Sequence, residues 1–159
     1  IAVSAAISPT VASAETSIVI GFQQEPTSLD PTADATASID GMLVQNVYES
    51  LTTVNEEGEV KPQLAESWTV SDDGLTYVFD LVDGATFHDG TGFDAEDVVF
   101  SFNRAMDDDS VNPTKKLFKP IESVLATDAG TIEIKLKQTD AFFLFNMAQG
   151  DASIVAPES

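Results

Sequence analysis

The segment FHDGTGFDAEDVVFSF, residues 87–102, contains the side chains of this sequence that are best suited to chemistry. It holds the only histidine of the chain, His88, directly before the carboxylate of Asp89. The acidic residues that follow are Asp94, Glu96 and Asp97. Imidazole and carboxylate groups can hold a metal ion, or can act as general base and general acid in a hydrolase. The alternative is a structural role, in which the segment forms a turn and the start of a helix.

A metal site is poorly supported by the ligands that are present. His88 and Asp89 are adjacent, so in an extended chain they face opposite sides and cannot readily share one ion. The sequence has no second histidine and no cysteine, which leaves a transition-metal site incomplete. The acidic run at residues 107–109 lacks the alternation and the glycine of a calcium loop. We therefore expect no metal and no cofactor.

Nucleophilic catalysis has equally little support. A Ser-His-Asp triad could use only His88, and no serine lies in a nucleophile-elbow pattern. The absence of cysteine excludes a thiolate nucleophile. Paired carboxylates for glycoside hydrolysis remain possible among 27 acidic residues, although nothing singles out two of them. We expect no catalytic residues, and a secreted carboxylate-dependent hydrolase is retained as the alternative from a different class.

The structural interpretation accounts for the whole segment. Gly90 can adopt positive φ in a turn formed with His88 and Asp89. Asp94 is a good N-cap, and the next two acidic residues favour the first helical turn. Arg104 lies near the helix C-terminus, where a cation is favourable. The apolar residues at helical spacing are Ala95, Val98, Val99, Phe102 and Met106.

Two elements are predicted ahead of this corner. The apolar run SIVIGF, residues 17–22, is typical of a strand buried on both faces. Residues 23–34 contain two prolines and short polar side chains, which predict an extended loop. From about Ala37 the apolar period changes to four, which predicts a helix face. That face would consist of Ile39, Leu43, Val47 and Leu51.

An antiparallel meander is predicted after that helix. Residues 65–71 and 75–81 flank the turn Asp72-Asp73-Gly74, a strong hairpin signal. A second pair would run from residues 121–124 to residues 131–137. Aromatic residues are assigned to the core, because they supply its bulkiest side chains. These are Trp68 and Phe87, whereas Phe142, Phe143 and Phe145 would belong to a short helix that packs against the meander, with Asp140 as its N-cap.

Net charge and the first residues address partners and location. A formal charge of −20 leaves too few cations to bind nucleic acid or anionic lipid. Residues 1–14, IAVSAAISPTVASA, are small and apolar and end in Ala12-Ser13-Ala14, a pattern typical of a signal-peptidase site. We therefore predict export, with Glu15 as the mature N-terminus. Without a cysteine, a lipid anchor is not expected.

The order of three segments resembles a known family. They are EPTSLDP, VYESLTTVNEEGEVKPQLAESWTVSDDGLTYVFDL and GATFHDGTGFDAEDVVFSFNRA. Together they are similar to extracellular solute-binding proteins of the peptide/nickel class, family 5, the receptors that feed ABC importers. The resemblance extends from about Ile18 to Pro157.

The resemblance implies an α/β fold like that of periplasmic binding proteins of type II, in which two lobes close on the ligand. Residues 1–14 would be the signal peptide remnant, and residues 15–45 the start of the first lobe. Residues 46–150 would form a small α+β extra domain with an antiparallel meander, and residues 151–159 would return into the first lobe. The second lobe would be absent.

The resemblance also implies a function and a set of contacts. The protein would capture di- or oligopeptides in the periplasm, as a monomer, and deliver them to a membrane permease. A nickel-chelate or oligosaccharide receptor on the same scaffold is the alternative. The implied ligand residues are Glu25, Thr32, Asp34, Ala35 and Thr36 in one loop and Gln149, Gly150, Asp151 and Ala152 at the crossing back to the first lobe.

Overall fold

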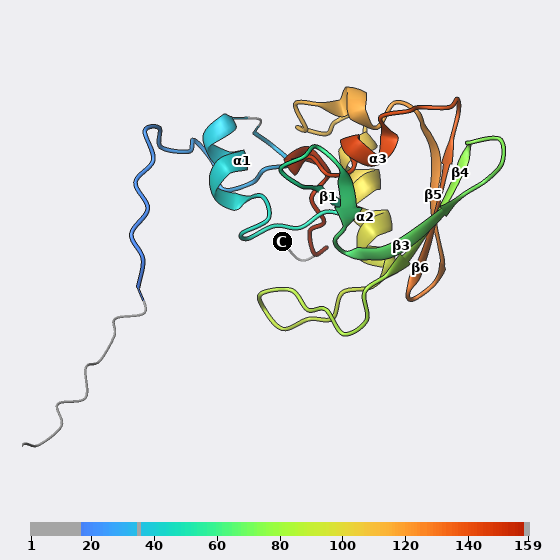
Figure 1. Ribbon diagram of the computed structural model, residues 1–159, viewed down its shortest axis with the longest axis horizontal. Helices are drawn as coiled ribbons and strands as arrows, with labels where there is room; N and C mark the ends of the chain where they lie inside the picture. Colours follow the sequence, from blue (N-terminus) through green and yellow to red (C-terminus); the bar gives the residue numbers. More distant parts are fainter. Residues whose placement is uncertain (1–16, 35, 158–159) are drawn as a thin grey trace, which may run out of the picture.

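The computed structural model describes residues 17–34 and 36–157 of the chain (Figure 1). Its longer helix, α2 (Ala95–Met106), packs against a four-stranded sheet. The strands of that sheet are β3 (Ala65–Val70), β4 (Thr76–Leu81), β5 (Ile121–Asp128) and β6 (Thr131–Leu136). The remaining elements are α1 (Ala37–Leu43), β1 (Thr52–Val54), β2 (Val60–Pro62), η1 (Lys115–Leu117), α3 (Phe143–Asn146) and η2 (Gly150–Ala152).

The sheet has the strand order β3-β4-β6-β5, with every neighbouring pair antiparallel. Two hairpins therefore lie side by side, joined through the pairing of β4 with β6. In the first turn Gly74 has φ +70°, a conformation that glycine adopts without steric penalty. Both predicted hairpins are confirmed, with their turns at residues 72–74 and 129–130.

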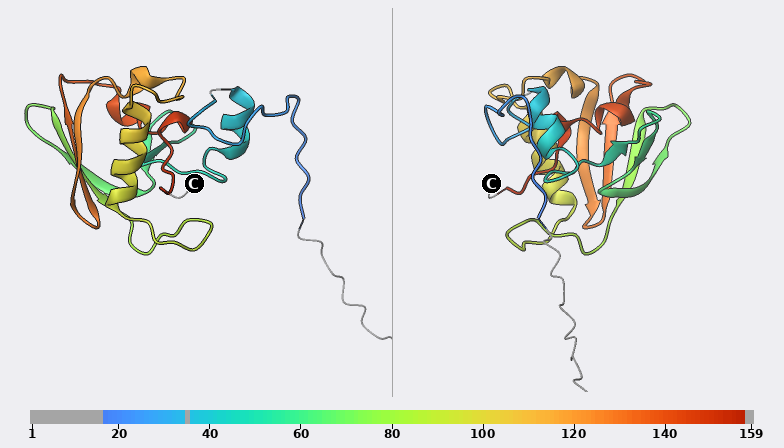
Figure 2. Two further views of the ribbon diagram at one scale, coloured as in Figure 1. Left: turned by 180° about the vertical axis from the view of Figure 1, so that it is seen from behind. Right: turned by 60° about the vertical axis from the view of Figure 1, so that its left-hand side comes forward.

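The hydrophobic core lies between this sheet and α2. Figure 2 shows the helix against the sheet from two further sides. Alternate residues of the strands point inward, so Phe79, Ile132 and Ile134 are fully buried. From the helix, Val98 and Phe102 meet them on the predicted apolar stripe. The strands with the period-two pattern and the helix with the period-four pattern thus face one another across a single core.

The segment that raised the question of catalysis is a corner of this fold. The Phe87 backbone N–H donates to the Thr91 carbonyl at 2.9 Å, and Gly90 has φ +90°. Asp94 is the N-cap of α2, and its carboxylate accepts from the Glu96 N–H at 2.8 Å. In return the Asp97 carboxylate accepts from the Asp94 N–H at 2.9 Å, which completes a capping box. The predicted turn and cap are confirmed.

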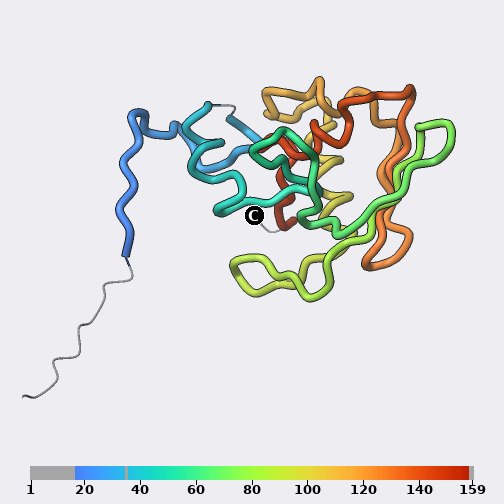
Figure 3. The backbone as a smooth tube through the Cα atoms, in the orientation of Figure 1, coloured from blue at the N-terminus to red at the C-terminus, as the bar shows by residue number. Residues whose placement is uncertain are grey.

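The strand predicted at residues 17–22 is wrong. The chain there is extended but unpaired, and it runs away from the body of the molecule (Figure 3). Ile18 is 82% exposed and Val19 is 96% exposed. A strand requires neighbours for its N–H and C=O groups, and in the described part of the chain no strand lies beside this run. Its apolar sequence is consistent with burial only if such neighbours are supplied.

The long helix predicted from Ala37 is also wrong beyond its first two turns. The helix ends at Leu43, and Gln45 adopts φ +67°, in the left-handed region. The Gln45 N–H donates to the Tyr48 carbonyl at 2.8 Å, so the chain turns where the pattern continued. As a result Val47 is exposed on the surface, whereas Leu51 is buried in the sheet-side core. A period of four continued by chance across a turn.

The core assignment of Trp68 and Phe87 is confirmed, but the short helix needs correction, because Phe142 is 69% exposed and Phe145 is 40% exposed. Trp68 and Phe87 are partly buried and pack at the edge of the core, and Phe143 is fully buried. However, the N-cap of α3 is Phe142, and Asp140 is not the cap. Its carboxylate accepts from the Phe142 N–H at 2.9 Å, because α3 is a single short turn that begins later than expected.

The core cluster runs from Leu51 to Ile154, whereas the buried residues of α1 lie outside it. The division into residues 15–45, 46–150 and 151–159 remains a prediction, and the leader assigned to residues 1–14 lies outside the described residues. Among the described residues, no helix has the length and apolar character needed to cross a bilayer.

Candidate ligand-binding site

The structure brings together the two segments from which ligand contacts were predicted. η2 lies against α1, so closely that a Cβ atom added to Gly150 would lie 2.7 Å from Asp40 Oδ1 and 2.7 Å from Val44 Cγ2. The same atom would lie 3.5 Å from the Pro31 Cβ. Residues more than 100 positions apart in the sequence therefore form one surface, and glycine permits the close approach.

In the first segment the polar groups form local turns. The Asp34 carboxylate accepts from the Thr36 N–H at 3.0 Å and also from the Thr27 and Thr36 hydroxyls. These hydrogen bonds, the one from Thr27 above all, lower the pKa of Asp34. Glu25 lies in the exposed stretch before this turn, and Ala35 lies outside the described residues.

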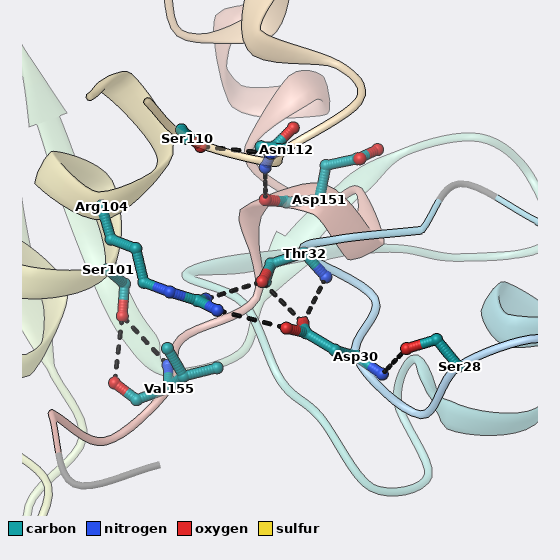
Figure 4. Close-up of polar contacts among 9 residues, drawn as sticks. All are labelled: Ser28, Asp30, Thr32, Ser101, Arg104, Ser110, Asn112, Asp151 and Val155. Carbon is teal, nitrogen blue, oxygen red and sulfur yellow. Dashed lines mark hydrogen bonds and ion pairs between the residues drawn. The ribbon is translucent and has the colours of Figure 1, made fainter. Parts of the chain in front are cut away.

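Thr32 is buried, as Pro31 is, whereas Glu25, Asp34 and Thr36 are not. Its hydroxyl donates to Asp30 Oδ1 at 2.6 Å and accepts from Arg104 Nη1 at 2.7 Å. A second guanidinium nitrogen of Arg104 contacts Asp30 Oδ2 at 3.2 Å. Figure 4 shows these three side chains converging from the loop and from α2. Burial acts to raise the pKa of Asp30, but the Thr32 hydrogen bonds and the Arg104 guanidinium together lower it.

The second segment presents both bonded and unbonded polar atoms. The Gln149 side-chain amide donates to the Phe145 carbonyl at 3.2 Å, and the Asp151 carbonyl accepts from Asn112 Nδ2 at 3.0 Å. Within the described residues, Asp151 Oδ1 is buried without a hydrogen-bond partner. Ala152 is buried and contributes packing rather than a polar contact.

Electrostatics make this surface negative. Burial, and next the nearby charge of Asp151, raise the pKa of Asp40. A hollow of about 470 Å³ lies over this contact, between α1 and the residues just before η2. Its polar lining includes Asp40, Gln149 and the backbone of Gly150. Such a surface suits a cationic group such as an ammonium, together with hydrogen-bonding groups that backbone amides can meet.

A larger hollow of about 670 Å³ lies elsewhere, and His88 lines it. It is bordered by Tyr48, Phe87, Arg104 and residues 154–156, and by none of the predicted ligand residues. Among the described residues, no group of three or more histidines, cysteines or carboxylates converges as a metal site would require. We take the hollow over the α1–η2 contact as the candidate site, because Gln149 and Gly150 of the second predicted segment line it; none of the described residues predicted in the first segment does.

Sequence reasoning missed three residues that hold these segments: Asp30, Arg104 and Asn112. Arg104 was interpreted only as a cation near a helix end, yet it is the single arginine of a chain with seven basic residues. That rarity is a signal, because a planar guanidinium can hold two acceptors at once. Asn112 gave no signal, since its partner lies in a segment distant in the sequence.

Comparison with known proteins identifies the class. Residues 59–159 match the model of the bacterial extracellular solute-binding proteins, family 5 Middle. The chain belongs to this family, as its sequence motifs indicate. The fold is the α/β fold of type II periplasmic binding proteins that was predicted.

Individual relatives bind different solutes. The chain is 34% identical over 155 residues to the glutathione-binding protein GsiB of Escherichia coli O6:K15:H31, covering 98% of this chain and 30% of that protein. The periplasmic binding protein DppA of Helicobacter pylori in complex with peptide STSA is 30% identical, with a TM-score of 0.70, and 83% of this chain covers 29% of it. NikZ of Campylobacter jejuni in complex with Ni(L-His) is 28% identical, with a TM-score of 0.72, and 83% of this chain covers 26% of it. The chain thus spans about 30% of the length of the curated relatives it matches.

Proposed function

We propose that the full-length protein is the solute receptor of an ABC importer, and that it captures short peptides with a free amino terminus. It binds the solute without changing it covalently. The contact between α1 and η2 carries the proposal, because it places the Asp40 carboxylate beside Gly150 of the second predicted ligand segment, at a hollow that Gln149 also lines. The ligand residues proposed here are those predicted from the sequence, with Asp40 added.

The acidity of this hollow favours peptides over the other solutes. Asp40 and Asp151 lie close enough for their charges to interact, and an ammonium placed between them would relieve that repulsion. Backbone groups such as those of residues 149–151 can bond a peptide main chain without reading its side chains. The resemblance to a protein named for glutathione, itself a tripeptide, also favours a peptide as the ligand. Oligosaccharides carry no cation to match this charge.

Calorimetry on the full-length protein tests the proposal. We expect saturable binding of glutathione or of members of a di- to pentapeptide pool, and no binding of maltotriose or of Ni(L-His). The solutes recovered afterwards should be intact by mass spectrometry. Release of product would overturn the receptor function, and preference for the nickel chelate or the sugar would overturn the proposed specificity.

Matched variants then test whether Asp151 binds the ammonium group at the amino terminus of the peptide. Asp151→Asn should weaken binding of a free peptide about tenfold or more, as expected for a lost charge-assisted hydrogen bond. The same variant should bind the N-acetylated peptide as the wild type does. Asp128→Asn, at the end of β5 and outside the lining of the hollow, removes the same charge and should leave both affinities unchanged.

We also propose that the protein acts as a monomer in the periplasm and passes its solute to a membrane permease. Residues 1–14 would direct export, so mass spectrometry of periplasmic protein should give Glu15 as the first residue. An intact leader on protein recovered from the cytoplasm would contradict this. Light scattering of the purified receptor should give the mass of one chain.

A further inference from the structure

We infer that Arg104 and Asn112 are positioning residues for ligand binding: from α2 and the loop that follows it, they hold the two candidate ligand segments at a fixed spacing. This rests on the proposed function. Neither residue contacts the hollow between α1 and η2. Their role is to fix the loop that contains Thr32 and the turn that contains Asp151 relative to each other.

The hold on the first segment is a two-point contact. Arg104 Nη1 donates to the Thr32 hydroxyl at 2.7 Å, and Arg104 Nη2 contacts Asp30 Oδ2 at 3.2 Å. Thr32 in turn donates to Asp30 at 2.6 Å, so the three side chains close a ring of contacts. A planar fork engaged at two points fixes orientation as well as distance, which a point charge cannot do.

The hold on the second segment comes from the loop after α2. Asn112 Nδ2 donates to the Asp151 carbonyl at 3.0 Å, while Asn112 Oδ1 accepts from the Thr114 N–H at 2.9 Å. Asn112 is buried, so its amide is fixed at both ends. On α2, one turn before Arg104, Ser101 Oγ accepts a hydrogen bond from the Val155 N–H at 3.0 Å (Figure 4). Val155 lies just after η2 in the chain.

Nearly all other side-chain hydrogen bonds of the first segment are local. The Asp34 carboxylate bonds Thr27 and Thr36, and Asp30 accepts from the Thr32 amide. Such bonds shape the loop but do not place it relative to η2. The hydrogen bonds from the α2 side add to the Gly150 contact in placing the loop, because the N-terminus of α2 is capped and its inner face is packed into the core. Pre-organisation of this kind strengthens binding, because the loops need not be ordered by the ligand.

The inference predicts that affinity and stability respond differently to one substitution. The Arg104–Asp30 pair is more than a third exposed on both sides, and exposed ion pairs contribute little to stability. In the full-length receptor, Arg104→Met should therefore weaken binding of the best peptide by about tenfold. Its melting temperature should stay within about 2 °C of the wild type. Arg104→Lys, which keeps the charge and loses the fork, should restore only part of the affinity.

The chain contains a matched control. Lys135 and Glu122 pair at 3.1 Å on the sheet, with exposure similar to that of the Arg104–Asp30 pair. Lys135→Met changes the net charge by the same amount and should leave peptide affinity unchanged. A double-mutant cycle of Arg104→Met with Asp30→Asn should show coupling in the binding affinity, and the cycle of Lys135→Met with Glu122→Gln should show none.

Hydrogen exchange supplies a readout that needs no ligand. Arg104→Met should speed exchange in residues 28–36 and leave β4 and β6 protected, whereas Lys135→Met should not change exchange in residues 28–36. Wild-type affinity in Arg104→Met, in a receptor that binds peptide, would overturn the positioning role and leave the proposed function standing. A wild-type receptor that binds none of the solutes would overturn the proposed function. In that case hydrogen exchange of residues 28–36 in Arg104→Met tests the positioning role. Exchange equal to that of the wild type would overturn the positioning role.

Discussion

Gly150 lies at the closest approach between η2 and α1. A methyl group there would lie 2.7 Å from a carboxylate oxygen of Asp40 and 2.7 Å from a methyl carbon of Val44. The carboxylate can rotate away, but the branched side chain of Val44 has little freedom at χ1. The fit therefore constrains the backbone of the second candidate ligand segment through the side chains of Asp40 on α1 and of Val44 just after it.

Gly150→Ala should destabilise the protein by about 1–3 kcal/mol, the usual cost of forcing an extra carbon into a filled space. Denaturant unfolding measures this free energy. Gly92→Ala is the control, because an added Cβ there meets no atom within 4 Å. Equal stability of the two variants would show that η2 and α1 are not in contact in solution.

The charge of Asp40 should oppose folding at neutral pH. Burial first, and then Asp151, raise the pKa of Asp40 above its ordinary value of 3.8. The ionised form is thus less favourable in the folded state, and this penalty is present above the folded-state pKa and vanishes below pH 3.8. Asp40→Asn should raise the melting temperature at pH 7, by at most about 2 °C because solvent screens the group. At pH 3 the variant and the wild type should melt together.

The pKa of Asp89 is shifted in the opposite direction to that of Asp40, so Asp89 serves as the control for that experiment. Hydrogen bonds from the Thr91 hydroxyl and amide lower the pKa of Asp89, so its ionised form stabilises the fold above its ordinary pKa. Asp89→Asn should lower the melting temperature at pH 7. A rise in both variants would indicate a general effect of net charge and not the environment of Asp40.

At the scale of elements, α2 depends on its capping box. Replacing Asp94 with alanine removes the acceptor for the Glu96 N–H and should cost about 1 kcal/mol of stability. Asp94→Asn keeps a side-chain acceptor and should cost less, so the difference between the two variants isolates the hydrogen bond from the charge. Chemical denaturation of the two proteins measures it, and equal losses would mean that the charge alone matters.

Elements whose partners are close in sequence could be predicted from the sequence. Each hairpin carries its own turn and its own alternation, and α2 carries its own cap, so each pattern is complete within about 20 residues. Residues 17–22 required partners that the described chain lacks. The helix after Ala37 ended because Gln45 entered a left-handed turn, which no residue type in that stretch indicates.

The candidate site was predictable only in part. Family resemblance nominated the segments, and the structure brings Gly150 to the loop that contains Pro31. The residues that hold the segments, Arg104 and Asn112, could not be found in this way. Their roles depend on contacts across 39 and more positions, and local patterns carry no information about such contacts.

At the scale of the whole molecule, charge is far from balanced. With 27 acidic and seven basic residues, mutual repulsion should destabilise the compact chain at low ionic strength. Raising sodium chloride from about 0.01 M to about 0.15 M shortens the screening length from about 30 Å to about 8 Å. The melting temperature should rise by several degrees, about 2–4 °C for each kcal/mol regained. Potassium chloride should act alike, and a melting temperature indifferent to both salts would show that the charges are already dispersed.

The strand order β3-β4-β6-β5 sets the order of events during folding. Each hairpin closes a short loop, whereas the pairing of β4 with β6 must bring together residues separated by α2 and the long connection after it. Closing that long loop costs entropy before any contact offsets it, so it should limit the folding rate. Shortening the half-buried side chain of Val78, on β4 opposite Glu133 of β6, should then slow refolding more than shortening Val70 on the outer strand β3. Stopped-flow refolding of Val78→Ala and Val70→Ala measures the two rates, and a larger effect at Val70 would place the first hairpin, not the joining of the two, in the slow step.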